Sequence, residues 1–320
     1  MADTNELIEA LEGRAERRSE RRDFFKAFGM AAAVAGGAAM AARSSVANAQ
    51  TTAPSEGDVL NFALNLEYLE AQFYLFAVNG TGLPANLTTG AGGNPGAVTG
   101  GRQVTFTDPA VAAYAREIAA DEQAHVAFLR NAIGATAVAQ PAIDISASAN
   151  GAFSNAARAA GLIGAGQSFD PYASDENFLL GAFIFEDVGV TAYKGASILI
   201  NTPAFLEAAA GILAVEAYHA AIVRTTLYAK GIQTPSAMLI ESTEAISRAR
   251  DSLDGPTDLD QGVANIGDAS NIVPLDSNGL AFSRSAGQVL NIVYLNNAAV
   301  TQGGFFPAGV NGAIRTSAAN

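Results

Sequence analysis

The sequence predicts an all-α protein, built as an up-down four-helix bundle with a long crossover between the second and third helices and a partly helical C-terminal extension. Three observations support this prediction. Apolar residues recur every three or four positions in four long segments bounded by helix start and stop signals. Each segment carries a glutamate among its apolar residues. In two of them a histidine follows the glutamate by three residues, and the chain has only these two histidines.

The first helix is expected over residues 58–78, with Asp58 as its N-cap and a stop at Asn79-Gly80. Glu67 lies in the apolar stripe of this helix. Glu70 follows one turn later on nearly the same face. We expect Glu70 at an exposed edge, with the alternative that it replaces Glu67 as the functional carboxylate.

The second helix follows a long loop over residues 80–107 that is rich in Gly, Thr, Pro and Asn. Asp108 supplies an N-cap and Pro109 the first helical residue, and the helix is expected to stop at Gly134. This helix carries Glu122 and His125. A spacing of three places both side chains on one helical face.

The third helix begins near Asp175, after a crossover over residues 134–173 in which we expect little regular structure. Its Glu186 stands in an otherwise almost wholly apolar stretch, where an uncompensated charge is costly. The carboxylate therefore needs a specific partner.

The fourth helix is separated from the third by Asn201-Thr202-Pro203, so tight a turn that the two helices must be antiparallel neighbours. It is expected to end at Lys230 with Gly231 as its C-cap. It carries Glu216 and His219, which repeat the spacing of the second helix.

Composition narrows the possible chemistry. The chain is 49% hydrophobic and lacks Cys, so it has no disulfide, no Cys-ligated metal and no thiol nucleophile. Residues 50–320 hold 11 Lys/Arg and 24 Asp/Glu, which gives the whole net charge of −13, because residues 1–49 hold seven of each. A chain this acidic is not expected to bind nucleic acid or an anionic membrane surface.

The N-terminal 49 residues have the pattern of a twin-arginine export signal. Arg21-Arg22 precedes an apolar Ala/Gly-rich run, and Ala47-Asn48-Ala49 supplies a cleavage pattern. The run is too weak for a stable membrane span. We therefore expect a periplasmic mature protein that begins at Gln50. Its domains would be the bundle over residues 50–232 and an extension over 233–320, packed on the bundle.

The four helices together present Glu, Glu-x-x-His, Glu and Glu-x-x-His in chain order. Di-iron and di-manganese four-helix bundles use this arrangement of ligands. Four carboxylates balance the charge of two divalent cations, and each cation also receives one imidazole. The pattern therefore predicts a dinuclear site for two iron or two manganese ions, and it does not choose between the metals.

On these motifs the chain resembles the ferritin-like superfamily, in particular exported ferritin-like proteins related to desiccation-induced proteins. Residues 58–78 are similar to the first helix of bacterioferritins, where, as in rubrerythrins, a tyrosine follows the ligand glutamate by seven residues. Glu67 and Tyr74 match that spacing, whereas Glu70 does not. The resemblance implies six metal ligands: Glu67, Glu122, His125, Glu186, Glu216 and His219.

The resemblance also implies a supporting shell. Glu122 and Glu216 would bridge the two metals, and Asp121 would orient His219. Bacterioferritin-type sites have a second such Asp, but position 215 is Val, so His125 lacks this partner. Apart from the resemblance, Tyr74, Tyr193 and Tyr218 are expected to be packing residues, with the alternative that they are radical or hydrogen-bonding neighbours of the site.

Three classes of function remain open at the level of sequence. The first is a redox enzyme that dismutates hydrogen peroxide or performs ferroxidase-like oxidation with dioxygen. The second is iron storage, which long insertions and export disfavour. The third is a non-enzymatic stress or desiccation scaffold, because a fold does not fix a function. The sequence assigns no catalytic residue, and it leaves homo-oligomerisation open.

Overall fold

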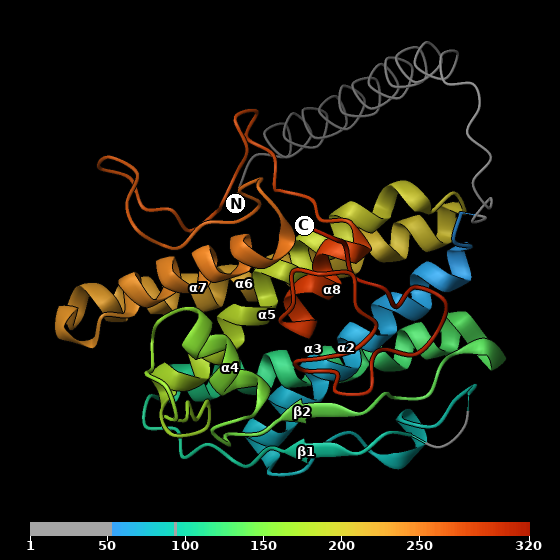
Figure 1. Cartoon of the computed structure of the whole chain (residues 1–320), viewed down its shortest axis with the longest axis horizontal. Helices are drawn as coiled ribbons and strands as arrows, with labels where there is room; N and C mark the ends of the chain where they lie inside the picture. Colours follow the sequence, from blue (N-terminus) through green and yellow to red (C-terminus); the bar gives the residue numbers. More distant parts are fainter. Residues whose placement is uncertain (1–52, 93–94) are drawn as a thin grey trace, which may run out of the picture. The chain divides into compact units, whose positions relative to one another are not determined.

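A computed structural model describes residues 53–92 and 95–320 of the chain. These residues form a helical bundle, as the sequence predicted (Figure 1). Helix α2 packs along α3 and helix α5 along α6, so the bundle consists of two helical hairpins. The bundle helices are α2 (Glu56–Asn79), α3 (Pro109–Ile133), α5 (Asp175–Ala196) and α6 (Pro203–Gln233).

Two predicted helix ends are wrong, for local reasons. Helix α2 starts earlier than expected: Ser55 is its N-cap, and Asp58 is the third helical residue, which hydrogen-bonds back to Ser55 in a capping box. Helix α6 runs past Gly231 to Gln233, because Gly231 keeps a helical backbone and the chain breaks only before Pro235. Asp108 caps α3 and Gly134 follows its end, as predicted.

The crossover between α3 and α5 is more ordered than expected. It contains strand β2 (Ile143–Ile145) and helix α4 (Ala152–Ala159). Strand β2 pairs in parallel with β1 (Val98–Gly100) from the preceding loop, along the outside of the α2–α3 hairpin (Figure 1). Short 3₁₀ turns complete the connections: η1 (Ala85–Leu87), η2 (Gly134–Thr136), η3 (Ser197–Leu199) and η4 (Pro235–Ala237).

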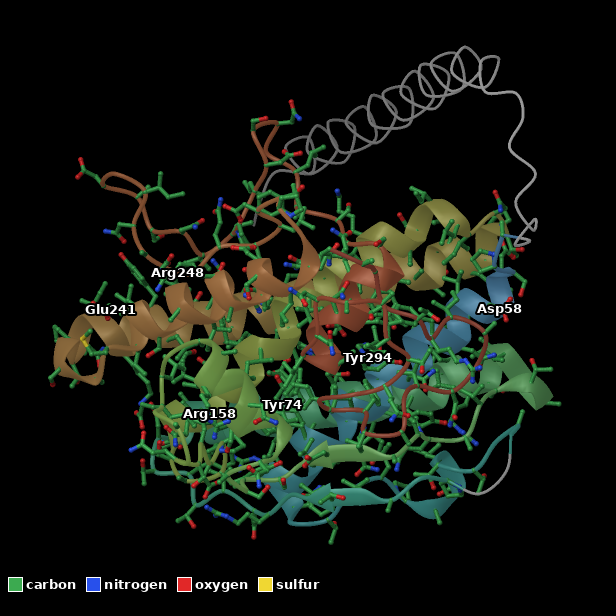
Figure 2. The ribbon with its side chains drawn as sticks, viewed as in Figure 1. Asp58, Tyr74, Arg158, Glu241, Arg248 and Tyr294 are labelled. Carbon is green, nitrogen blue, oxygen red and sulfur yellow. The ribbon has the colours of Figure 1, made fainter. Side chains whose placement is uncertain are left out.

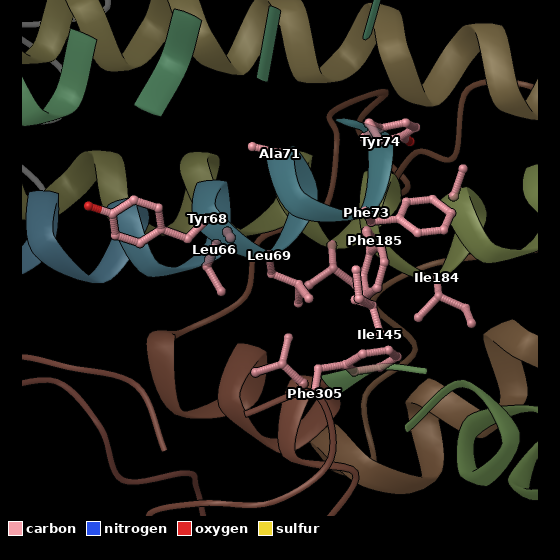
Figure 3. Packing of buried hydrophobic residues seen from close by; sticks show 14 of the residues in the cluster. Leu66, Tyr68, Leu69, Ala71, Phe73, Tyr74, Ile145, Ile184, Phe185 and Phe305 are labelled. Atoms are coloured by element: carbon pink, nitrogen blue, oxygen red, sulfur yellow. The ribbon is translucent and has the colours of Figure 1, made fainter. Parts of the chain in front are cut away.

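The C-terminal extension shares the hydrophobic core of the bundle. It contributes helices α7 (Leu239–Asp254) and α8 (Ala286–Tyr294), followed by irregular chain. Phe305, fully buried in this last segment, packs edge-on against Phe185 of α5 with ring centroids 4.9 Å apart (Figure 3). The extension thus covers the residue next to Glu186.

Buried ion pairs also join the extension to the bundle. Arg224 of α6 donates to Asp187 of α5 at 2.8 Å, and Arg250 of α7 donates to the same carboxylate at 3.2 Å. Arg284 donates to Asp260 at 2.5 Å, and Arg250 also donates to Asp260. All five side chains are buried, so the extension is fixed to α5 and α6 by charges as well as by packing.

Helix α6 is, among the helices of the described residues, the one long and apolar enough to cross a membrane by length and composition. Its place in the bundle accounts for part of this apolar character, because its inner side packs against the neighbouring helices. Leu206 and Tyr218 remain exposed on its outer side.

Candidate metal centre

The six side chains implied as metal ligands converge at mid-bundle, and each of the four bundle helices supplies at least one of them. Helix α2 supplies Glu67, and α5 supplies Glu186. Helices α3 and α6 each supply a glutamate and a histidine one turn apart. All six residues are buried, and the most exposed of them, His125, is 8% exposed.

The first group of potential ligands surrounds His125. Its Nδ1 atom lies 3.2 Å from Glu67 Oε2, 3.6 Å from Glu122 Oε2 and 3.8 Å from Glu216 Oε1. One ligand atom from each of these four residues lies within 4.8 Å of every other. The group can therefore surround a single ion with three carboxylates and one imidazole.

The second group surrounds His219. Its Nδ1 atom lies 3.0 Å from Glu122 Oε1 and 3.8 Å from Glu186 Oε2. Glu122 belongs to both groups, with one oxygen directed to each histidine, which is the placement that a bridging carboxylate requires. Glu216, the other expected bridge, lies in the first group alone.

Unpaired polar atoms test whether a metal fits these residues. Eight buried atoms of the six side chains have no hydrogen-bond partner among the described residues. They are Glu67 Oε2, Glu122 Oε1 and Oε2, His125 Nδ1, Glu186 Oε2, Glu216 Oε1 and Oε2, and His219 Nδ1. Buried polar atoms in native proteins are normally satisfied, and a bound ion is one accepted explanation of exceptions. The donor set fits divalent iron or manganese.

The pKa values of the carboxylates also favour a bound cation. Burial raises the pKa of Glu67 to about 7 and that of Glu186 to about 8, with the charge of Glu122 adding to both shifts. Burial opposes the charge on Glu122 too, but its contacts with the two histidines lower its pKa to about 2. The carboxylates therefore repel one another, and cations relieve that repulsion.

Burial and the neighbouring carboxylates have opposite effects on the pKa values of the two histidines. Burial lowers a histidine pKa, but here the contacts with Glu122 outweigh it. With further help from Glu67, they raise the pKa of His125 to about 11. With help from Glu186, they raise that of His219 to about 9. In the absence of metal, protons on these rings would neutralise part of the cluster.

A supporting shell holds the ligands in place. Asp121 Oδ2 lies 3.2 Å from His219 Nε2, the atom on the far side of the ring from Glu122. The hydroxyl of Tyr193 donates to Glu67, and that of Tyr74 donates to Glu186. Such contacts fix ring and carboxylate orientation in metal sites. Tyr218 is 70% exposed, which does not fit the packing role expected for it.

The two histidines are not equivalent. Val215 occupies the position where a second acidic residue would accept a hydrogen bond from His125. Among the described residues, His125 Nε2 makes no hydrogen bond comparable to that between Asp121 and His219. The outer nitrogen of the His219 ring thus has a carboxylate partner, and that of the His125 ring has none among the described residues.

Sequence reasoning misjudged two residues at this site. Glu70, expected at an exposed edge, is only 5% exposed, and burial together with Glu122 raises its pKa well above the usual range. Gly189 of α5 was overlooked. A Cβ atom there would lie 2.2 Å from Glu216 Oε2, so the absence of a side chain makes room for that carboxylate. Its position one turn after Glu186 is the signal in the sequence.

The fold and this cluster define the class: a four-helix bundle with a buried carboxylate on every helix is a ferritin-like protein. The comparison of sequences agrees, since the family described as ferritin-like domain matches residues 55–229. The chain belongs to this family and is related to desiccation proteins.

Two relatives extend the comparison beyond the bundle. The desiccation-related protein PCC13-62 of Craterostigma plantagineum is 30% identical over 246 residues, which cover 72% of this chain and 75% of the relative. The ferritin-like catalase Nec2 of Nesocodon mauritianus is 28% identical over 267 residues, 80% of this chain and 84% of the relative. No solved structure matches the chain.

Proposed function

We propose that this chain is an exported oxidoreductase with a dinuclear iron or manganese centre that reacts with hydrogen peroxide or dioxygen. The observation that carries the proposal is the set of eight unpaired buried ligand atoms, divided into two groups that share Glu122. Two redox-active ions bound side by side there would exchange electrons with a single O–O unit.

Each of the two ions would have its own set of protein ligands. Glu67, Glu216 and His125 would hold one ion, and Glu186 and His219 the other, with Glu122 between them. Tyr193 and Tyr74 would fix the two terminal carboxylates, and Asp121 would hold the His219 ring with Nδ1 facing inward. Because the six ligand residues are buried, bulk water has little access to their ligand atoms.

Peroxide dismutation is the leading reaction, because one relative that aligns over most of the chain is named a ferritin-like catalase. Ferroxidase-like oxidation uses the same ligand set. The name of the other relative favours a second candidate, a stress or desiccation scaffold in which the bundle binds no metal. The buried repulsion among four carboxylates argues against that scaffold, since apolar residues would stabilise an empty core better.

The test compares the wild type with the Glu122→Ala/Glu216→Ala variant. Elemental analysis of protein from its native host should find close to two Fe or Mn per wild-type chain and none in the variant. At free metal one thousand times the dissociation constant, binding to the folded state alone adds about 4 kcal/mol per site. Metal should thus raise the melting temperature of the wild type only. If neither protein gains metal or consumes peroxide or dioxygen, the scaffold function replaces the enzyme.

Export is part of the proposal, and its motifs lie outside the described residues. Arg21 and Arg22 with the Ala47-Asn48-Ala49 cleavage pattern support a twin-arginine route and a mature chain from Gln50. Replacing both arginines by Lys should leave the precursor in the cytoplasm, as cell fractionation would reveal. Normal export of that variant would refute the twin-arginine assignment.

A further inference from the structure

A groove between α3 and α6 leads from the surface to the candidate metal centre. Its volume is about 540 Å³, and His219 lies at its inner wall. Helix α3 makes few contacts with α6, whereas α2–α3 and α5–α6 pack closely along their lengths. The bundle is therefore sparsely packed on the side where the two Glu-x-x-His helices face each other.

The walls of the groove carry acidic groups in line with the centre. Glu117 is exposed, and Asp121 follows it one turn later on α3. Asp121 contacts His219 Nε2 at 3.2 Å, and His219 Nδ1 lies 3.0 Å from Glu122. From the solvent to the buried site, the order of these side chains is thus Glu117, Asp121, His219 and Glu122.

A second cavity approaches the centre from the end of the bundle, but its chemistry differs. Its volume is about 20 Å³, and its lining is apolar apart from Tyr193, whose hydroxyl is bonded to Glu67. Phe128, Phe205 and Ala208 are among the residues around it. A hydrated divalent cation would lose its water there without gaining any oxygen ligand.

From these contrasts we propose that the α3–α6 groove is the route by which divalent metal enters the centre, with Glu117 and Asp121 attracting the cation. Negative charge at the mouth of a cleft raises the local cation concentration and the rate of association. Asp121 then delivers the cation beside His219. The inference rests on the proposed metal centre and adds its route of loading.

The first experiment tests the charge at the groove. Mn(II) uptake by metal-free protein is followed by the loss of the EPR signal of the free aqueous ion. Glu117→Gln should slow uptake about threefold or more at low salt, and the difference should vanish near 0.5 M NaCl, where charges are screened within a few ångströms. Final occupancy should not change, because Glu117 is not among the ligands. Glu241→Gln, an exposed change on α7, is the control and should leave the rate unaltered.

The second experiment blocks the groove physically. The chain lacks Cys, so one introduced cysteine can be labelled selectively. Ile222 is half-buried in the groove one turn after His219, and Ile222→Cys carrying a pyrene maleimide should slow Mn(II) uptake at least tenfold without changing the final occupancy. The same cysteine carrying only a methylthio group should slow it far less. Ile232→Cys is the matched control, the same change on α6 about 15 Å away and exposed.

Ala208→Cys, labelled in the same way, blocks the apolar end cavity. Slower uptake with that label, or unchanged uptake with the pyrene label at position 222, overturns the proposed route while leaving the metal centre intact. If unlabelled wild type takes up no Mn(II) in equilibrium dialysis, the metal centre and its route fail together. Slower uptake with the label at position 222 alone supports the groove.

Discussion

Gly189 and Glu216 face each other across α5 and α6 so closely that a Cβ atom at position 189 would lie 2.2 Å from Glu216 Oε2. A glycine in the middle of a helix costs about 1 kcal/mol relative to alanine, so this position needs a local reason. The reason is the carboxylate, because the two atoms nearest to that Cβ position belong to the flexible end of Glu216. Gly189 thereby positions Glu216 beside His125.

The first prediction follows from this contact. Gly189→Ala should fold, since only a side-chain end has to move, but it should displace Glu216 and weaken Mn(II) binding about tenfold or more in equilibrium dialysis. Gly211→Ala in α6 is the matched control. No atom lies within 4 Å of its new methyl group, so it should stabilise the fold by up to about 1 kcal/mol and leave Mn(II) affinity unchanged. Wild-type affinity in Gly189→Ala would contradict the positioning role.

A second prediction concerns the two buried hydroxyls that donate to the terminal carboxylates. Tyr193→Phe removes the donor of Glu67, and Tyr74→Phe removes that of Glu186. Each variant should bind Mn(II) about 10-fold to 100-fold more weakly, because the freed carboxylate can rotate away from the ion. Isothermal titration calorimetry measures the change.

Tyr68→Phe separates this effect from stability. Tyr68 is equally buried, but its hydroxyl donates to the carbonyl of Val138 at 3.1 Å, away from the centre. This variant should lose about 1 kcal/mol of unfolding free energy and keep its Mn(II) affinity. Equal affinity losses in all three variants would mean that the tyrosines act through general stability.

Helix order and the main carboxylate and histidine positions were predictable because both are local properties. Asp108 before Pro109 fixes the start of α3 through its own cap, and a spacing of three fixes Glu122 and His125 on one face. The antiparallel pairing of α5 and α6 follows from the short connection before Pro203.

The remaining features depend on contacts between distant segments. Whether Glu70 is exposed depends on which helices cover that face of α2, and the sequence of α2 alone does not contain this information. The pairing of residues 98–100 with 143–145 likewise joins two loops that look irregular separately. The same holds for Arg224, whose partners lie 37 to 48 residues away.

The third prediction concerns Arg224, which fastens the extension to the bundle. Besides Asp187, it donates to four backbone carbonyls at 2.6–2.8 Å, those of Gln261, Gly262, Asn271 and Ile272. Arg224→Met removes the donor for these carbonyls and one of the two arginines that pair with Asp187, so unfolding by urea should show a loss of about 3–5 kcal/mol. Arg224→Lys should not restore the unfolding free energy, because an ammonium group cannot reproduce the planar fork of donors of the guanidinium group.

Arg248→Met provides the comparison for Arg224. Arg248 is exposed on the outer side of α7 (Figure 2). Its replacement should change stability by no more than about 0.5 kcal/mol. A small effect at both positions would show that the extension is held by apolar packing rather than by the buried charges.

The last prediction is a pH dependence away from the metal centre. Burial, reinforced by the charges of Asp260, Asp258 and Asp254, raises the pKa of Asp251 to about 7. Its Oδ1 atom also lacks a hydrogen-bond partner among the described residues. A carboxyl group with a raised folded-state pKa destabilises the fold as pH rises from about 4 to about 7, because the unfolded chain releases the proton first.

Asp251→Asn should therefore stabilise the protein at pH 8 and have little effect at pH 4.5, as measured by urea unfolding at both values. The full shift would correspond to about 4 kcal/mol, but solvent screens this partly exposed group, so we expect about 1 kcal/mol. Asp268→Asn, at an exposed position, is the control and should give no difference between the two pH values. A gain for Asp251→Asn that is equal at pH 4.5 and pH 8 would assign the effect to packing of the amide, since a charge effect must disappear once the wild-type carboxyl group is protonated.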